Sequence, residues 1–387
     1  MVNDGVSRRD FLQTSMAGAS ALTLGVTGAS RVLGANNEVV LGFIGVGGRG
    51  ERLLKGLLDM KGVRVSAICD LRQERVDEKK EIAAQWKPKG YLDFRQMLDK
   101  EKFDGVIVAT EVGNHAKCVV PVLEAGLNCF SEKPMDCTAE KVDSIVKAAR
   151  ASKGKYQVGF QRRYNPLFRD AIAKIHKGEF GDVYFLQGHW HWEWEVGGTG
   201  WVSNVDMSGG EIVEQACHHM DVMNWVMKDQ HPLYCVAMGA TMSPKAKESP
   251  HEHITEDHSA AIFEFPGGVK YSYTHLFYCP KQFTGEQLRV YGHKSGIDLR
   301  MGNFYDSKNP DQPLDESQPN WDAGTIEELE SFVNDVCRNG KKAMSNEDTG
   351  RVSTFMSLMA RKAMYSRETK KFVPTVVAWE DMGSDLG

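Results

Sequence analysis

The first half of the chain alternates short apolar runs with longer stretches of mixed polarity. The apolar runs predict strands, and the mixed stretches predict helices that turn one apolar face inward. Strands are expected at 39–46, 63–70, 103–110 and 128–131, and helices at 50–58, 72–85, 115–125 and 138–152. Strands and helices alternating at this spacing predict an α/β domain with a doubly wound parallel sheet.

The pattern changes after residue 154 to one with a period of two. Polar and apolar residues alternate through 183–196, 234–241, 259–265, 269–277 and 287–291, as in strands with one buried face. Pro266-Gly267-Gly268 separates two of these runs and predicts a hairpin turn. Helices are expected at 165–177, 325–338 and 348–365. We therefore predict a C-terminal α+β domain with a mostly antiparallel open sheet.

The first 35 residues have the pattern of an export signal. Ser7-Arg8-Arg9-Asp10-Phe11-Leu12 precedes a weakly apolar run at 16–26, and the small residues near Leu33-Gly34-Ala35 suit cleavage. This order is typical of a twin-arginine signal, and a disordered tail is the alternative. We divide the chain into a signal segment (1–35), a parallel-sheet domain (36–153) and an α+β substrate and oligomerisation domain (154–387). The expected location is the periplasm.

Composition excludes several classes of function. A net charge of −5 and a pI near 6.2 leave no electrostatic footprint for nucleic acid. Outside the leader, no apolar stretch is long enough for an ordinary transmembrane helix. The eight cysteines form no CxxC pair, which argues against a zinc ribbon or a thioredoxin motif.

A glycine-rich turn joins the first predicted strand to the first predicted helix. It reads Gly45-x-Gly47-x-x-Gly50. Gly45 allows a tight turn, Gly47 lets the backbone approach a pyrophosphate, and Gly50 lets helix and strand pack closely. In this strand–turn–helix context the motif is the fingerprint of a dinucleotide-binding Rossmann domain.

Residues around this turn bear on the choice of cofactor. Gly48 and Arg49 open the helix, whose free N–H groups attract phosphate. Asp70 ends the next predicted strand and should hydrogen-bond the adenosine ribose diol, which favours NAD. Arg49 and Arg72 are close enough in sequence to meet a 2′-phosphate, so NADP remains an alternative.

Lys133 follows the predicted strand at 128–131, in the sequence Ser131-Glu132-Lys133-Pro134. The carboxyl ends of the strands form the ligand crevice of a doubly wound sheet, so this lysine is expected to face the cofactor. The alternative is an ordinary exposed lysine after a strand. Proline stiffens the turn.

Residues 209–221 form a second candidate group. Glu214 and His218 are four residues apart and would share one face of a helix, with Asp221 on the same side. A carboxylate beside an imidazole can orient it and raise its pKa, which suits general acid–base work. The alternative is a salt bridge on a helix face.

The histidine-rich segments are open to several interpretations. His189 and His191 share one face of a predicted strand, and further histidines lie at His251, His253 and His258. They could bind metal, sugar or only water; without rigid ligand spacing, no metal site is predicted. Trp190, Trp192 and Trp194 alternate with the first pair and are expected in the sheet core, with sugar stacking as a lesser alternative.

Together these motifs resemble the Gfo/Idh/MocA family, the relatives of glucose–fructose oxidoreductase and inositol dehydrogenase. The resemblance extends from about residue 38 to 374. The matching pieces are the glycine turn, Ala109-Thr110 with His115, Glu132-Lys133-Pro134, Arg163-Tyr164-Asn165-Pro166, and the run from Gly209 to Asp221.

The resemblance assigns roles to these residues. It implies that Lys133 and His218 are catalytic, with Glu214 at the position where the family usually has aspartate. It places Glu132 near the nicotinamide ribose. The cofactor residues it implies also include Thr110 and His115, and the substrate residues are Arg163, Tyr164, His218 and Asp221. Glu111 stands where many relatives have proline.

We expect an NAD(P)-dependent oxidoreductase that acts on a sugar, polyol or glycoside hydroxyl. His218 would remove the hydroxyl proton, Lys133 would polarise the developing carbonyl, and Glu214 would hold His218. An exported enzyme would need a tightly held cofactor that is reoxidised in place, by a second sugar or by oxidation, elimination and re-reduction. The second route makes a glycoside hydrolase the alternative; a non-catalytic sugar-binding protein is a third. A homodimer or homotetramer is expected.

Overall fold

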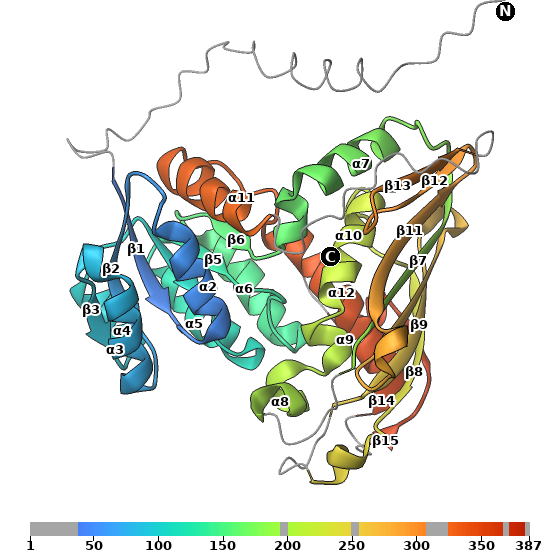
Figure 1. Ribbon diagram of the computed structural model, residues 1–387, viewed down its shortest axis with the longest axis horizontal. Coiled ribbons are helices and arrows are strands. Elements are labelled where there is room, and N and C mark those ends of the chain that lie inside the picture. The colour runs from blue at the N-terminus through green and yellow to red at the C-terminus, as the bar shows by residue number, and fades with distance from the viewer. Residues whose placement is uncertain (1–37, 194–199, 249–254, 307–323, 367–370, 384–387) are drawn as a thin grey trace, which may run out of the picture. The chain divides into compact units, whose positions relative to one another are not determined.

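The computed structural model describes residues 38–193, 200–248, 255–306, 324–366 and 371–383 (Figure 1). The proposed signal segment, Trp194, His251 and His253 lie outside these ranges. All eight cysteines lie within them, and each is a free thiol. Among the described residues, no helix combines the length and apolar character needed to cross a bilayer.

The first sheet is parallel throughout and has the predicted doubly wound order. Its six strands run β3-β2-β1-β4-β5-β6. The strands are β1 (Val39–Ile44), β2 (Val63–Cys69), β3 (Lys89–Tyr91), β4 (Gly105–Val108), β5 (Asn128–Ser131) and β6 (Tyr156–Val158). The helices between them are α2 (Gly48–Leu57), α3 (Gln73–Ile82), α4 (Phe94–Lys100), α5 (His115–Glu124) and α6 (Ala139–Ala151). The Rossmann prediction is confirmed.

The second sheet has eight strands in the order β13-β12-β11-β7-β10-β9-β8-β16. Its strands are β7 (Val183–His191), β8 (Tyr234–Ala240), β9 (His258–Glu264), β10 (Lys270–Leu276), β11 (Gly285–Gly292), β12 (Ser295–Asp298), β13 (Asn303–Asp306) and β16 (Val376–Ala378), and a separate pair is β14 (Tyr365–Ser366) and β15 (Lys371–Phe372). All neighbouring strands are antiparallel except β7 and β10, which are parallel to each other. The sheet is therefore mixed, and the prediction of a mostly antiparallel sheet is confirmed.

Helices cover one face of this sheet. They are α7 (Pro166–His176), α8 (Val205–Ser208), α9 (Glu211–Glu214), α10 (Cys217–Val226) and α12 (Glu347–Met364). Figure 1 shows α12 between the second sheet and the helices of the first, and it packs against both β8 and α6. On the other face, β8 exposes Tyr234, Val236 and Met238 at every second position.

A segment near the C-terminus completes the first domain. α11 (Thr325–Glu330) continues as a π-helical stretch, η8 (Ser331–Arg338), and Figure 1 shows α11 beside α2 and β1. Leu329 and Phe332 are fully buried in the same core as β1, and the ring of Phe332 lies 5.7 Å from that of Phe130. The first domain is therefore discontinuous in sequence. β6 and this segment both belong to it, although they lie outside the predicted range 36–153.

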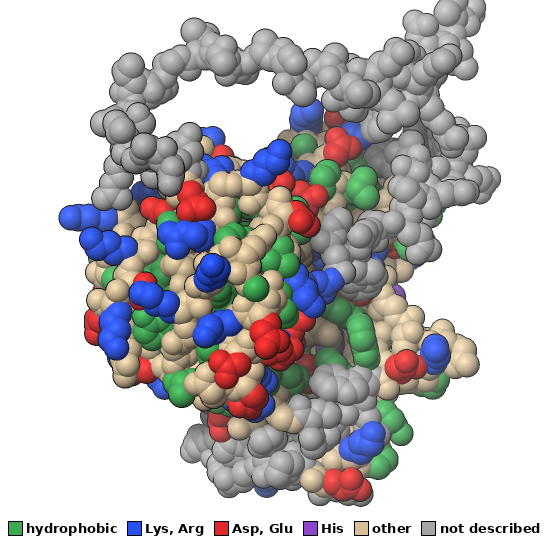
Figure 2. Space-filling model, turned by 60° about the vertical axis from the view of Figure 1, so that its left-hand side comes forward, with side chains coloured by type: hydrophobic (Ala, Val, Ile, Leu, Met, Phe, Trp, Pro, Cys, Tyr) green, Lys and Arg blue, Asp and Glu red, His purple; other side chains and the backbone are tan. Residues whose placement is uncertain are grey.

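The surface carries charges of both signs. Figure 2 shows Lys and Arg side chains interspersed with Asp and Glu over the face in view, without a continuous basic area.

Candidate active site

The glycine turn has the geometry that a dinucleotide requires. Gly45 has φ +83°, and a Cβ on Gly50 would lie 2.3 Å from the oxygen of Gly45. A side chain at Gly50 would thus push strand and helix apart, and Gly48 has open space around it. α2 begins at Gly48 with no side-chain cap, so its first N–H groups are available to an anion. These residues fit a pyrophosphate.

Asp70 lies beside this turn, as predicted. The backbone N of Val46 donates to Asp70 Oδ2 at 3.0 Å, and the backbone N of Arg72 donates to Oδ1 at 3.1 Å. The guanidinium nearest to Asp70 is that of Arg75, with Nη1 3.8 Å from Oδ2. The same Nη1 would lie 3.4 Å from a Cβ on Gly47. Arg75, which the sequence motif did not single out, therefore lies next to both the glycine turn and the Asp70 carboxylate.

Lys133 lies at the carboxyl end of β5 and forms an ion pair with Glu214. Its Nζ donates to Glu214 Oε1 at 2.9 Å and to the backbone oxygen of Glu214 at 2.7 Å. The side chains are 13% and 20% exposed, so the pair is largely removed from water. Burial alone would lower the pKa of Lys133, but the Glu214 carboxylate raises it above its ordinary value. The lysine remains a cation across the neutral range.

His218 is buried at the start of α10. Burial, followed by the positive charges of Lys133 and Arg162, lowers the pKa of His218 well below its ordinary value. The imidazole is therefore neutral, and its Nδ1 has no hydrogen-bond partner among the described residues. Its ring lies 6.1 Å from that of Trp190.

The predicted Glu214–His218 pair does not form. The helix is interrupted at Gln215 and Ala216, so α9 ends at Glu214 and α10 begins at Cys217. Four-residue spacing therefore does not place the two side chains on one helix face. Glu214 pairs with Lys133 instead, and the pKa of His218 is lowered rather than raised. The expectation that Glu214 holds His218 was wrong in this respect.

Thr110 and His115 lie in the loops beside the turn. A Cβ on Gly45 would lie 2.9 Å from Thr110 Cγ2, so this threonine packs against the glycine turn. His115 is 1% exposed, with Nδ1 2.8 Å from the oxygen of Pro134 and Nε2 3.1 Å from that of Thr110. His115 thus joins the loops after β4 and β5.

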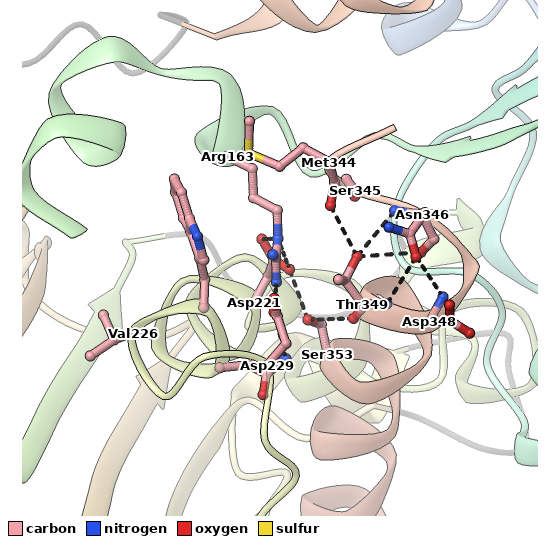
Figure 3. A network of polar contacts seen from close by, with 12 residues as sticks. Arg163, Asp221, Val226, Asp229, Met344, Ser345, Asn346, Asp348, Thr349 and Ser353 are labelled. Atoms are coloured by element: carbon pink, nitrogen blue, oxygen red, sulfur yellow. Dashed lines mark hydrogen bonds and ion pairs between the residues drawn. The ribbon is translucent and has the colours of Figure 1, made fainter. Parts of the chain in front are cut away.

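Arg163, Tyr164 and Asp221 are parts of the core, which corrects their predicted role in substrate binding. Arg163 Nε donates to both oxygens of Asp221, at 2.8 and 3.0 Å, and its Nη2 donates to Asp229 at 2.7 Å (Figure 3). Asp221 also accepts from Ser353 Oγ of α12. Arg163 and Asp221 are each 1% exposed, and the hydroxyl of the buried Tyr164 accepts from a backbone N. Their partners are internal, so they tie α10 to α12.

A charged cluster next to His218 was missed in the sequence. Its members are Arg162, His219, Glu286 and Arg300. Arg162 Nη2 donates to Glu286 Oε1 at 2.8 Å, and its guanidinium lies over Trp190 at 5.4 Å. Burial opposes ionisation of Glu286, but the charge of Arg162 holds its pKa at about 2. The sequence signal that could have indicated this cluster was the arginine pair Arg162-Arg163. Arg162 faces the second sheet, whereas Arg163 enters the core.

The histidines of β7 lie apart from this cluster. His189 and His191 stack at 4.5 Å on the face opposite Trp190, and His258 pairs with Asp257 at 2.6 Å. Trp190 is buried as predicted, whereas Trp192 is 44% exposed. In the part of the chain that the structure covers, no three potential metal ligands come together.

Comparisons with known proteins agree with this geometry. A family model described as an oxidoreductase family with an NAD-binding Rossmann fold, GFO_IDH_MocA, matches residues 39–160. The GFO/IDH/MocA C-terminal domain model matches residues 168–298.

Relatives and solved structures point the same way. The chain is 28% identical over 197 residues to inositol 2-dehydrogenase of Salmonella typhimurium, covering 49% of this chain and 55% of that protein. It is 28% identical over 207 residues to alpha-N-acetylgalactosaminidase of Shewanella oneidensis, covering 46% and 44%. The chain thus spans about half the length of these curated relatives. The crystal structure of myo-inositol 2-dehydrogenase from Lactobacillus plantarum superimposes with a TM-score of 0.71 at 20% identity, over 88% of this chain and 99% of that one.

The fold and the glycine turn are those of an oxidoreductase family with an NAD-binding Rossmann domain, here followed by a second domain built on a mixed sheet. The chain belongs to the Gfo/Idh/MocA family, because models of both family domains match it in the family's order.

Proposed function

We propose that this protein is an NAD(P)-dependent oxidoreductase that oxidises a hydroxyl of a sugar, polyol or glycoside. The observation that carries the proposal is the juxtaposition of a buried cation with a neutral imidazole. After burial, the charge of Lys133, which follows β5, contributes most to lowering the pKa of His218 at the start of α10. Both lie at the edge where the glycine turn would place a dinucleotide.

The two residues divide the work on the substrate. A nicotinamide cofactor held at this edge would supply the acceptor for a hydride from the substrate carbon. His218, neutral and buried, accepts the hydroxyl proton. The Lys133 ammonium stabilises negative charge developing on the same oxygen, in a site where little water screens it. Glu214 fixes the position of the ammonium through two hydrogen bonds.

Replacing Glu214 by glutamine should move the alkaline limit of activity to lower pH. The carboxylate raises the pKa of Lys133 against the effect of burial. Without that charge the lysine pKa falls, so the ammonium is lost as pH rises through a range where the wild type still carries it. The measurement is kcat/KM against pH. Glu51→Gln, which removes a carboxylate from Lys79 instead, should leave the alkaline limit where it is. An unmoved limit in Glu214→Gln would contradict the assigned role.

We propose NAD as the preferred cofactor, with Arg75 rather than Arg49 or Arg72 as the residue that makes NADP accessible. Asp70 is placed to accept from the ribose diol, and it repels a 2′-phosphate. Asp70→Ser should weaken NADH binding and raise the NADPH-to-NADH affinity ratio by about tenfold or more, because Arg75 loses its carboxylate partner. Fluorescence titration measures both affinities. The double variant Asp70→Ser/Arg75→Ala should lose this gain; if it keeps the gain, another cation binds the phosphate.

Export and tight cofactor retention remain proposals that rest on the arginine pair Arg8-Arg9. The test is to purify the protein from the periplasm and to identify the bound ligand by its absorbance spectrum and mass. A bound dinucleotide in the exported protein supports the proposal. Protein retained in the cytoplasm, or free of dinucleotide, contradicts it.

The similarity to an alpha-N-acetylgalactosaminidase favours a second candidate function, glycoside hydrolysis through transient oxidation. Aryl glycosides and pairs of free sugars separate the two. Release of the aglycone without net redox change identifies a hydrolase, whereas oxidation of one sugar with reduction of another identifies an oxidoreductase. A sugar-binding protein without activity would catalyse neither reaction.

We also propose a homodimer or homotetramer formed through the outer face of the second sheet. Tyr234, Met238, Ile262 and Val376 lie on this face with 50–65% of their surface exposed. A soluble monomer rarely exposes a contiguous apolar patch of this kind. Met238→Lys should reduce the oligomer measured by light scattering.

A further inference from the structure

Three charged side chains meet between the glycine turn and Lys133, and the chemistry proposed above does not use them. Arg49 lies in the first turn of α2, Glu132 follows β5, and Glu328 lies on α11. Arg49 Nε donates to Glu132 Oε1 at 2.5 Å, and Nη2 donates to Glu328 Oε1 at 2.9 Å. Thr325 Oγ1 accepts from Nη1 at 3.4 Å. We call Arg49, Glu132 and Glu328 the arginine clamp.

The clamp holds one cation and two carboxyl groups. The side chain of Glu328 is fully buried, and its Oε2 has no hydrogen-bond partner among the described residues. Burial, assisted by the charge of Glu132, raises the pKa of Glu328 well above its ordinary value, although Arg49 opposes this. This shift favours the protonated, neutral form of Glu328. Glu132, whose side chain is 6% exposed, is then the carboxylate that balances the charge of Arg49.

The position of Glu132 connects the arginine clamp to Lys133 and to the cofactor. Glu132 immediately precedes Lys133, and Lys133 N donates to Glu132 Oε2 at 3.1 Å. Arg49 lies two residues after Gly47, on the helix whose N-terminus fits the pyrophosphate. A dinucleotide with its pyrophosphate at this helix and its nicotinamide ring near Lys133 would have its nicotinamide ribose beside Glu132. A carboxylate that is held in one orientation is well placed to accept hydrogen bonds from both hydroxyls of a ribose.

We propose that Arg49 is a positioning residue that fixes Glu132 for the nicotinamide ribose, with Glu328 as its neutral anchor on the C-terminal segment. The inference rests on the proposed function, since it requires a bound dinucleotide. Arg49 acts on the nicotinamide half of the cofactor, and not on its phosphates.

Two probes test the clamp: NADH, which has the nicotinamide ribose, and ADP, which lacks it. The full chain is dialysed and titrated with each. Arg49→Gln should raise the Kd of NADH about tenfold and change that of ADP by less than about twofold. Glu132→Gln should behave in the same way. Glu328→Gln, which keeps the shape and the neutral state, should change neither Kd by more than about twofold.

Arg338→Gln is the matched control. Arg338 ends the same C-terminal segment, and its Nη2 donates to the oxygen of Gly62 at 2.7 Å. It should leave both affinities unchanged. Arg49→Lys provides a second variant if Arg49→Gln unfolds, and it should weaken NADH selectively because lysine lacks the forked guanidinium.

Equal loss of NADH and ADP binding in the Arg49 variants would overturn the inference, because Arg49 would then act on the phosphates. Loss of NADH binding in Glu328→Gln as large as in Arg49→Gln would overturn the neutral state of Glu328. If the wild type binds neither NADH nor ADP, the proposed function itself fails. If the wild type binds both but the variants do not lose NADH binding selectively, only the inference about the arginine clamp fails.

Discussion

Lys133→Met should reduce kcat/KM by about 10³-fold, equivalent to about 4 kcal/mol of transition-state stabilisation. Methionine keeps the length and apolar stem of the side chain but removes the ammonium. The charge that acts on the substrate oxygen and on His218 is then lost, together with both hydrogen bonds to Glu214. Steady-state kinetics with a sugar or polyol that the wild type oxidises gives the measurement.

Lys79→Met is the matched control for this loss. Lys79 is also buried and also forms ion pairs with glutamates, Glu51 and Glu78, each at 2.7 Å, but it lies on α3. Its replacement should cost stability without a comparable loss of rate, and thermal melting of both variants separates the two effects. If Lys133→Met retained full turnover, Lys133 would not be catalytic and a sugar-binding role would become the better proposal.

His218→Asn should reduce turnover by about 10²- to 10⁴-fold, the range typical of a lost general base. Asparagine is similar in size and polar, but it cannot accept the proton. In the wild type, burial and Lys133 lower the pKa of His218 well below its ordinary value of 6.5, so the neutral form persists below that pH. The acid limb of kcat/KM should therefore lie below pH 6.5 and should disappear in His218→Asn.

His176→Asn tests whether any histidine change would have this effect. His176 lies at the end of α7, with Nε2 2.9 Å from the oxygen of Trp225, and no role in catalysis is assigned to it. It should retain both the rate and the acid limb. An acid limb centred at or above pH 6.5 in the wild type, or one that persists in His218→Asn, would show that another group is the base.

The first domain could be predicted from the sequence because local signals determine it. The apolar strand, the glycine turn and Asp70 are contiguous or nearly so, and the structure confirms the steric requirements predicted for Gly45 and Gly50. Lys133 was found in the same way, since the carboxyl end of a parallel strand is a position that topology alone defines. The period-two pattern likewise predicted five of the eight strands of the second sheet, β7 to β11, but not the short strands β12, β13 and β16.

The rest of the candidate site could not be predicted, because it depends on tertiary contacts that the spacing of residues along the sequence does not encode. Glu214 and His218 satisfy the four-residue rule, but the break at Gln215 and Ala216 separates them, and the lysine of another domain takes the carboxylate. Arg162 and Arg163 are adjacent, and only the packing of η3 (Gln161–Tyr164) decides which one enters the core. No local pattern distinguishes these outcomes.

The passage of residues 325–338 back through the core of the first domain makes the order of synthesis matter. Leu329, Phe332 and Val336 are translated after all six strands of the first sheet, yet they fill the interior beneath β1, which is made nearly three hundred residues earlier. A fragment truncated after β6 would leave that interior open to water. The nucleotide half of the molecule is therefore not a separable module, and a chimaera that exchanges it must carry this late segment with it.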